Sequence, residues 1–219
     1  MNTIAASPPG ISTPAVPLRW LPLGGVLGPL GYTVAWLVLG MLSPGYTAWG
    51  VHIAPYSPIS QSISGLGLGV TAPYMNAAFV LNGVLMLLAA IGIAAPLPRS
   101  RRTVFIALAL PGIGSILDGV FTLESFLGHT AGFALALTSI IGFPLTGALV
   151  RRLGGWTRIS TCLLAAGPLT LVLAIAYFVT FSPTPEGALT GVAGLTERLL
   201  VLELQLWYAV LGWRAFRHT

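Results

Sequence analysis

The chain has 219 residues, of which 55% are hydrophobic and only 7% are charged. A soluble domain needs roughly a quarter of its residues charged to cover its surface, so a mean hydropathy of +0.89 excludes a soluble protein and predicts an integral membrane protein. The formal charge of +5 comes from arginines that lie in short loops without interleaved aromatic residues. This pattern excludes nucleic acid as a partner.

The first residues predict a disordered tail. Residues 1–18 are rich in Pro, Ser and Thr, and no basic residue precedes Arg19, which excludes a secretory signal with a charged start. We expect residues 19–219 to form one domain.

Six apolar runs follow along the chain. Each is long enough, at a rise of about 1.5 Å per residue, to cross a hydrocarbon core about 30 Å thick. The fold class is therefore an all-α polytopic bundle of six transmembrane helices, in contact with the lipid bilayer. The predicted spans are approximately 19–43, 72–96, 103–121, 129–150, 159–181 and 192–213.

Arginine predicts the orientation of these spans. Nine of the ten arginines fall on one side of the six-span arrangement, and Arg198 alone falls on the other. The positive-inside rule then places both termini in the cytoplasm and the protein in the cell membrane as a multi-pass protein.

The segment 44–71, between the first two spans, is too polar for a span and too apolar for a linker. We expect an outer re-entrant or interfacial segment that folds back over the mouth of the bundle. Its serines, with Ser60 and Ser64 among them, could hydrogen-bond a ligand there, or Ser57 could cap an interfacial half-helix.

The acidic residues all lie in the outer half of this arrangement. An ionised carboxylate at depth costs at least about 2.5 to 3.5 kcal/mol, so Asp118 and Glu203 should face the bundle and have a partner or a role. We take both as candidate catalytic acids, with His129 and Glu197 as partner bases. The alternative for Glu203 is a structural hydrogen bond or ion pair with another helix. Glu124 and Glu186 are expected to be solvated loop acids.

Further polar and aromatic side chains are candidates for substrate binding. The asparagines could instead only hold helices together, and the aromatic faces could stabilise positive charge. The candidates are Arg198, Asn76, Asn82, Ser60, Ser64, Tyr56, Tyr74, Phe121, Trp207 and Tyr208.

Three stretches carry a family resemblance: "YSPISQSISGLG", "APYMNAAFVLNGVLMLLAAIGI" and "GIGSILDGVFTLESFLGHTAGF". Together they resemble a bacterial family of integral membrane proteins known as domain of unknown function 998. The resemblance covers most of the six spans and implies their architecture without an activity. It places Ser60, Ser64, Gly65, Asn76, Asp118 and His129 on shared positions.

Known catalytic signatures are missing from the sequence. It has no Walker loop, dinucleotide fingerprint, nucleophile elbow or His-Glu-x-x-His motif. Three histidines, one of them at the cytoplasmic end, argue against a metal or haem site. We therefore expect no cofactor and no metal.

These observations favour a membrane-embedded acid/base enzyme of the cyclase or isomerase type, which acts on a lipophilic small molecule in an outward-facing polar pocket. A small transporter or proton-coupled permease is the first alternative, and six spans would then call for a homo-oligomer. A noncatalytic membrane scaffold or lipid-binding subunit is the second.

The arginine asymmetry gives a test of orientation. A reporter fused after Thr219 and a second reporter inserted in segment 44–71 should report opposite sides of the membrane, because an odd number of spans separates them. Two reporters that report the same side would contradict the six-span arrangement.

Overall fold

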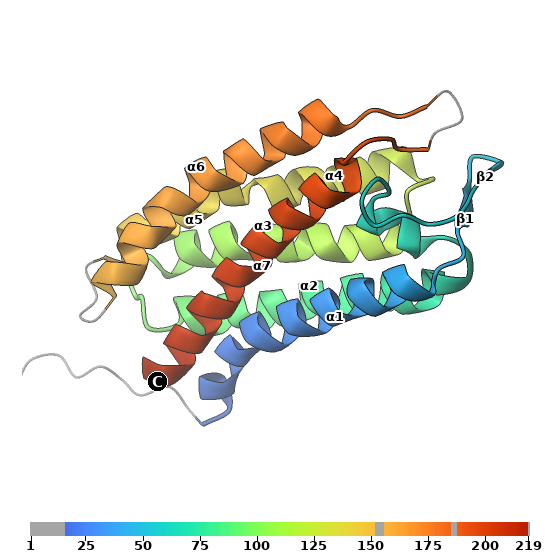
Figure 1. Ribbon diagram of the computed structural model, residues 1–219. Coiled ribbons are helices and arrows are strands. Elements are labelled where there is room, and N and C mark those ends of the chain that lie inside the picture. The colour runs from blue at the N-terminus through green and yellow to red at the C-terminus, as the bar shows by residue number, and fades with distance from the viewer. Residues whose placement is uncertain (1–15, 152–155, 185–187, 219) are drawn as a thin grey trace, which may run out of the picture.

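A computed structural model describes residues 16–151, 156–184 and 188–218. Helices dominate these residues and lie side by side in one elongated bundle (Figure 1). Residues 1–15 of the predicted tail at 1–18 lie outside the described residues, and so does Glu186. The elements are the 3-10 helices η1 (Val16–Leu23), η2 (Ile63–Gly67) and η3 (Gly69–Thr71), the strands β1 (Tyr46–Ala48) and β2 (Val51–Ile53), and the helices α1 (Gly24–Leu42), α2 (Ala72–Ala94), α3 (Arg101–Val120), α4 (Phe126–Leu137), α5 (Ser139–Val150), α6 (Thr157–Thr180) and α7 (Ala193–His218).

The six predicted spans are confirmed. Six helical stretches are long and apolar enough to cross a membrane: Leu18–Leu42, Gly69–Ala94, Arg101–Val120, Phe126–Val150, Thr157–Thr180 and Ala193–His218. The protein is therefore a multi-pass membrane protein. Many large apolar side chains, such as those of Leu81, Ile141 and Val172, are exposed on its flanks. Lipid is the solvent that makes such exposure favourable.

The fourth span, predicted as one helix over 129–150, is divided into two helices, α4 and α5. Thr138 separates α4 from α5, and the hydroxyls of Thr138 and Ser139 donate to the carbonyls of Leu135 and Ala136. Pro144 has no N–H to offer the carbonyl four residues earlier. These local bonds interrupt the backbone ladder, so that α5 packs on α6 as well as on α3, while α4 packs mainly on α3.

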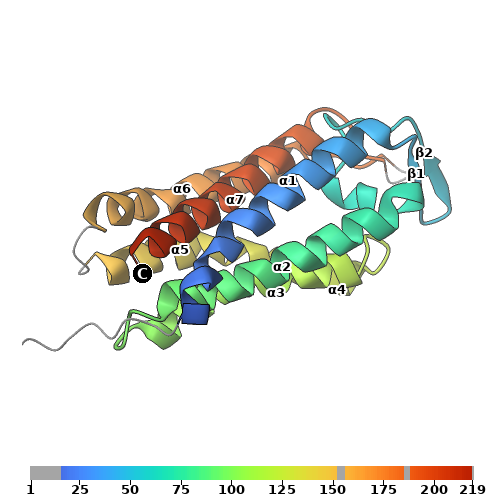
Figure 2. The same cartoon turned by 90° about the horizontal axis from the view of Figure 1, so that it is seen from below.

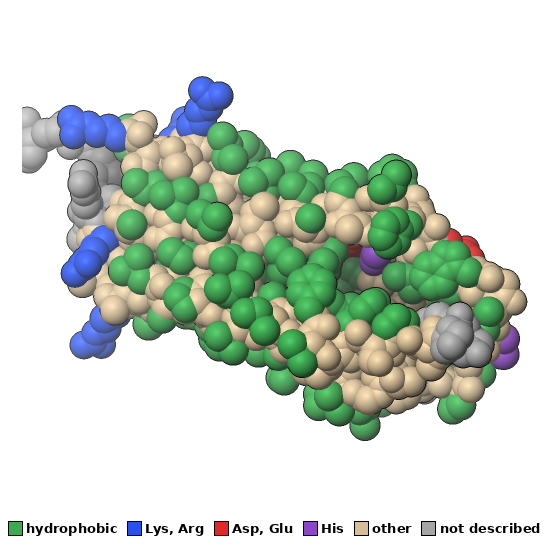
Figure 3. Space-filling view, turned by 90° about the horizontal axis from the view of Figure 1, so that it is seen from above, with side chains coloured by type: hydrophobic (Ala, Val, Ile, Leu, Met, Phe, Trp, Pro, Cys, Tyr) green, Lys and Arg blue, Asp and Glu red, His purple; other side chains and the backbone are tan. Residues whose placement is uncertain are grey.

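The two ends of the bundle differ in charge. We call one the arginine end, because Figure 3 shows the basic side chains at that end and acidic side chains toward the other. Trp20 and Phe216 stack there with ring centroids 5.3 Å apart, so η1 and the last turns of α7 meet at the same end. We call the other the hairpin end, because β1 and β2 pair there as an antiparallel hairpin, with Thr47 opposite His52.

Two apolar clusters fill the bundle. The cluster of the arginine half is built from α2, α3, α5, α6 and α7, and its centre includes Leu108, Phe143 and Leu211. The cluster of the hairpin half joins α1 and the start of α2 to segment 44–71, through residues such as Trp36 and Leu66. In Figure 2, α1 crosses the bundle between α7 and α2, and it packs on both helices.

Glycines allow the closest helix contacts. A Cβ added to Gly83 of α2 would meet the carbonyl oxygen of Gly112 and would lie 2.7 Å from Cγ1 of Ile116, both on α3. The two backbones therefore pack directly against each other, as is common between small residues in membranes.

Replacement of Gly83 by Ala should destabilise the protein by about 1 to 3 kcal/mol, because the added methyl group forces α2 and α3 apart. Gly31→Ala is the matched control, since a Cβ at Gly31 meets no atom within 4 Å. Unfolding of the purified protein in detergent measures the difference. Equal stability of the two variants would contradict the close packing of α2 on α3.

Candidate functional site

Segment 44–71 covers the start of α7. The backbone N–H groups of Gly194 and Leu195 donate to the carbonyls of Ser60 and Ile59, at 3.1 and 2.9 Å. The first N–H groups of a helix have no partner within the helix, so the segment supplies the acceptors that α7 lacks. A Cβ at Gly194 would collide with the carbonyl of Gln61, and a glycine is therefore needed at this contact.

Arg198 fixes the segment to the bundle. Its Nη1 donates to the carbonyls of Gln61 and Gly194 at 2.9 and 2.8 Å, and its Nη2 donates to the Tyr56 hydroxyl at 2.5 Å. The guanidinium also lies 5.4 Å from the ring centroid of Trp36. This buried cation thus binds the protein's own groups, whereas the sequence alone suggested a role in substrate binding.

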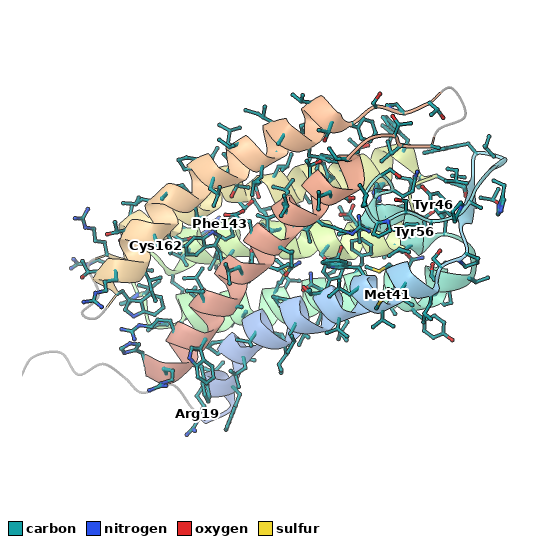
Figure 4. All side chains as sticks on the ribbon, viewed as in Figure 1. Arg19, Met41, Tyr46, Tyr56, Phe143 and Cys162 are labelled. Carbon is teal, nitrogen blue, oxygen red and sulfur yellow. The ribbon has the colours of Figure 1, made fainter. Side chains whose placement is uncertain are left out.

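Two tyrosines complete the covering layer (Figure 4). Tyr46 and Tyr56 lie near each other at the hairpin end, with ring centroids 6.3 Å apart. The Tyr46 hydroxyl donates to Oε1 of Gln61 at 2.9 Å, and the Tyr56 hydroxyl donates to the carbonyl of Ser62. Burial raises the pKa of Tyr46 to about 12, with a smaller contribution from Glu197. Burial likewise raises the pKa of Tyr56, against the opposing effect of Arg198. Both phenols therefore stay protonated and keep donating.

Glu197 is buried beneath this layer. Its Oε2 accepts a hydrogen bond of 2.8 Å from the N–H of Ile63, at the start of η2, and 6% of the residue is exposed. The neighbouring Ser62 caps η2 by accepting from the N–H of Gly65. The expected half-helix after Ser57 is absent from the described residues: the Ser57 hydroxyl accepts from the N–H of Ser60 at 3.5 Å, but only a turn follows. The first helix of the segment, η2, begins at Ile63.

Asp118 and His129 form a pair across the α3 to α4 turn. Oδ1 of Asp118 lies 3.5 Å from Nδ1 of His129, and the same nitrogen lies 3.1 Å from the carbonyl oxygen of Phe121. The Asp118 carboxylate rests against Gly132 of α4, where any side chain would collide with it. Its Oδ1 has no hydrogen-bond partner among the described residues.

These groups open onto a cleft made of two adjoining cavities, which share Ser64, Phe133 and Glu197 as lining residues. The outer cavity holds about 490 Å³ and is mostly apolar, whereas the inner one holds about 60 Å³. Figure 3 shows the hollow on the face of the bundle, with a histidine at its rim. The outer cavity is lined by aromatic residues and His129, the inner one by Tyr32, Asn82, Ser115, Asp118 and Gln205.

The cleft opens between α4 and α6. Helix α4 packs on α3, and α5 packs on α6, but α4 has no extensive contact with α6. Aromatic rings bridge the gap, with the Phe133 centroid 5.6 Å from that of Tyr177 and 6.0 Å from that of Phe178. The backbone N–H of Trp49 donates to Oε1 of Glu124 at 2.9 Å, which links the hairpin to the α3 to α4 turn beside the opening.

The structure brings Asp118, His129 and Glu197 to one cleft but places Glu203 elsewhere. Oε2 of Glu203 accepts from the Thr170 hydroxyl at 2.9 Å, and its Oε1 accepts from Nε1 of Trp207 at 2.6 Å. Neither cavity has Glu203 or Arg198 among its lining residues. This position matches the packing alternative for Glu203, with its partner on another helix.

The remaining candidates divide in the same way. Ser64 and Asn82 line the inner cavity. Asn76 donates to the carbonyl of Gly67, and the Tyr208 hydroxyl donates to the carbonyl of Leu108, so both hold elements together. Tyr74 is 68% exposed on the flank. The Tyr56 hydroxyl contacts Arg198, and the backbone carbonyl of Phe121 contacts His129. The backbone carbonyl of Ser60 accepts from the N–H of Gly194.

Sequence reasoning missed Gln205. Within α7 a stripe at helical spacing lines the cleft: Glu197, followed three, four, seven and eight positions later by Leu200, Val201, Leu204 and Gln205. Glu203 is six positions from Glu197 and therefore faces away from this stripe. Because Gln205 follows Glu197 by eight positions, the sequence could have placed both side chains near one face of α7.

The chain matches one family model, described as Protein of unknown function (DUF998), over residues 26–214. It belongs to this family. No curated protein and no solved structure matches the chain.

Arg198→Met should destabilise the protein by about 3 kcal/mol or more, because several hydrogen bonds from a buried cation are lost. Protease sensitivity should rise between Tyr56 and Gln61. Arg158→Met is the control, since Arg158 is exposed near the start of α6. Thermal unfolding and limited proteolysis measure both effects, and an Arg198 variant as stable as the control would contradict the anchoring role.

Proposed function

We propose that this member of the DUF998 family is a membrane-embedded acid/base enzyme of the cyclase or isomerase type, which acts on a lipophilic small molecule. The observation that carries the proposal is the pair of Asp118 and His129, 3.5 Å apart in the cleft, with a buried carboxylate oxygen that has no hydrogen-bond partner in the described part of the chain. A carboxylate at such a depth is costly to keep and is typical of functional sites.

The arrangement is suited to proton transfer within an apolar molecule. Asp118, in its acid form, would donate its proton to a carbon–carbon double bond and leave a positive charge on the neighbouring carbon. Glu197 or His129 would then remove a proton from an adjacent carbon, so that a new double bond forms and the molecule regains neutrality. Return of that proton to Asp118, through His129 or water, would complete the cycle.

The aromatic lining supports the same chemistry. Tyr32, Phe133 and Tyr177 line the cleft around the carboxyl groups. The face of an aromatic ring attracts positive charge, so these rings would stabilise a cationic intermediate. The arginine end would lie on the cytoplasmic side of the cell membrane. The cleft would then open toward the outer leaflet.

The packing of the arginine half favours an enzyme over a permease. Below the cleft, residues of α2, α3, α5, α6 and α7 form an apolar cluster with Met86, Leu108, Phe143 and Leu211 buried in it. A transported solute or proton would have to cross this cluster, whereas a substrate that enters from the lipid would not.

Proton transfer to carbon leaves a label when the solvent is D₂O. Membranes that contain the wild-type protein should incorporate deuterium into a lipid of an added lipid extract, as detected by mass spectrometry. Asp118→Asn keeps the shape of the side chain and removes its titratable proton, so incorporation should fall by about 100-fold or more.

Glu203→Gln is the matched comparison, because it makes the same change at a carboxyl outside the cleft. It should keep incorporation at an equal amount of folded protein. If the wild-type protein retains a bound lipid yet incorporates no deuterium, the enzyme proposal is wrong and a lipid-binding subunit takes its place.

A further inference from the structure

We infer that the ligand of the cleft has a polar end that donates hydrogen bonds and carries no negative charge, namely an alcohol or an amine at one end of a lipophilic chain. The inference specifies the substrate class of the proposed function and rests on the same cleft. Three features carry it: acceptors without a hydrogen-bond partner in the inner cavity, a described lining without arginine or lysine, and the aromatic outer cavity.

Three acceptor oxygens of residues that line the inner cavity have no hydrogen-bond partner among the described residues. Asn82 is 2% exposed and Gln205 is 8% exposed, and Oδ1 of Asn82, Oε1 of Gln205 and Oδ1 of Asp118 all lack a hydrogen-bond partner among the described residues. Nδ2 of Asn82 donates to the Ser115 hydroxyl, which in turn donates to the carbonyl of Phe79, so this amide is held in one orientation. Buried acceptors without a partner are unfavourable, and a donor-bearing ligand would relieve that cost on binding.

An anionic head does not fit the same surface. The described residues that line the two cavities include the carboxyl groups of Asp118 and Glu197 but neither arginine nor lysine. The nearest cation along α7, Arg198, directs Nη1 and Nη2 to Gln61, Gly194 and Tyr56. A phosphate or carboxylate head would therefore find neither arginine nor lysine to pair with, and a buried anion without a counter-charge is costly.

The outer cavity fits the apolar chain of such a ligand. Phe126, Phe178 and Phe181 line it, and all three are more than a third exposed on the flank of the bundle. A chain that leaves the inner cavity past Phe133 would thus continue between α4 and α6 into the lipid. Its polar end would remain beside Asn82 and Gln205, and Asp118 would face the chain.

Photo-crosslinking can test this preference without any assay of turnover. Matched hexadecyl probes carry a diazirine in the chain and differ only in the head, which is a hydroxyl, an amine or a carboxylate. The hydroxyl or the amine probe should label α4 and the end of α6 in the purified protein, and the stronger of the two distinguishes an alcohol from an amine. The carboxylate probe should label these residues about tenfold less.

Gln205→Leu should weaken labelling by the favoured probe about tenfold, the factor expected for one lost hydrogen bond. Gln205→Met, with an unbranched apolar side chain, is a second variant if the first does not fold. Thr146→Val is the matched control, because its hydroxyl is also buried without a partner among the described residues yet lies outside both cavities. Labelling by this control should equal that of the wild-type protein.

Equal labelling by the carboxylate probe, or full labelling of the Gln205 variants, would overturn the inference. Neither result would affect the enzyme proposal, which depends on deuterium incorporation. Conversely, selective labelling without incorporation would leave the inference standing and remove the enzyme proposal.

Discussion

The cleft depends on the contact between segment 44–71 and the start of α7. Helix α7 begins without internal partners for its first N–H groups, and the carbonyls of Ser60 and Ile59 supply them. Arg198 then joins the same segment through Gln61 and Tyr56. Since Glu197 accepts from Ile63 in that segment, the position of a carboxyl in the cleft is set by the covering layer above it.

Two kinds of packing divide the bundle along its length. In the arginine half, glycines such as Gly83 and Gly112 bring helix backbones into direct contact, and the core between them is apolar. In the hairpin half, α4 and α6 are bridged by the aromatic rings of Phe133, Tyr177 and Phe178. Asp118, His129 and Glu197 lie in this half, where the helices leave room for the two cavities.

Much of the fold follows from the sequence, but the site follows only in part. Apolar length predicts all six spans to within a few residues, because a span is fixed by the thickness of the bilayer. The depth of Asp118 within its predicted span is also enough to make it a candidate site residue. Depth does not distinguish Glu203 from Gln205, since both lie at a similar level and only their direction around α7 separates them. The role of Arg198 could not be predicted either, because its partners in segment 44–71 are set by tertiary folding.

The break at Thr138 explains why the cleft opens sideways. An unbroken fourth span would have one axis and would pack against the same neighbours along its whole length. The hydroxyls of Thr138 and Ser139 bond to preceding carbonyls, and Pro144 leaves another carbonyl without its usual donor. After this break, α5 packs closely on α6, and Gly167 of α6 rests against the carbonyl of Ile140. Before it, α4 stays with α3, so that Asp118 fits against Gly132. The same interruption therefore separates α4 from α6, which gives the pair of Asp118 and His129 an opening to the lipid.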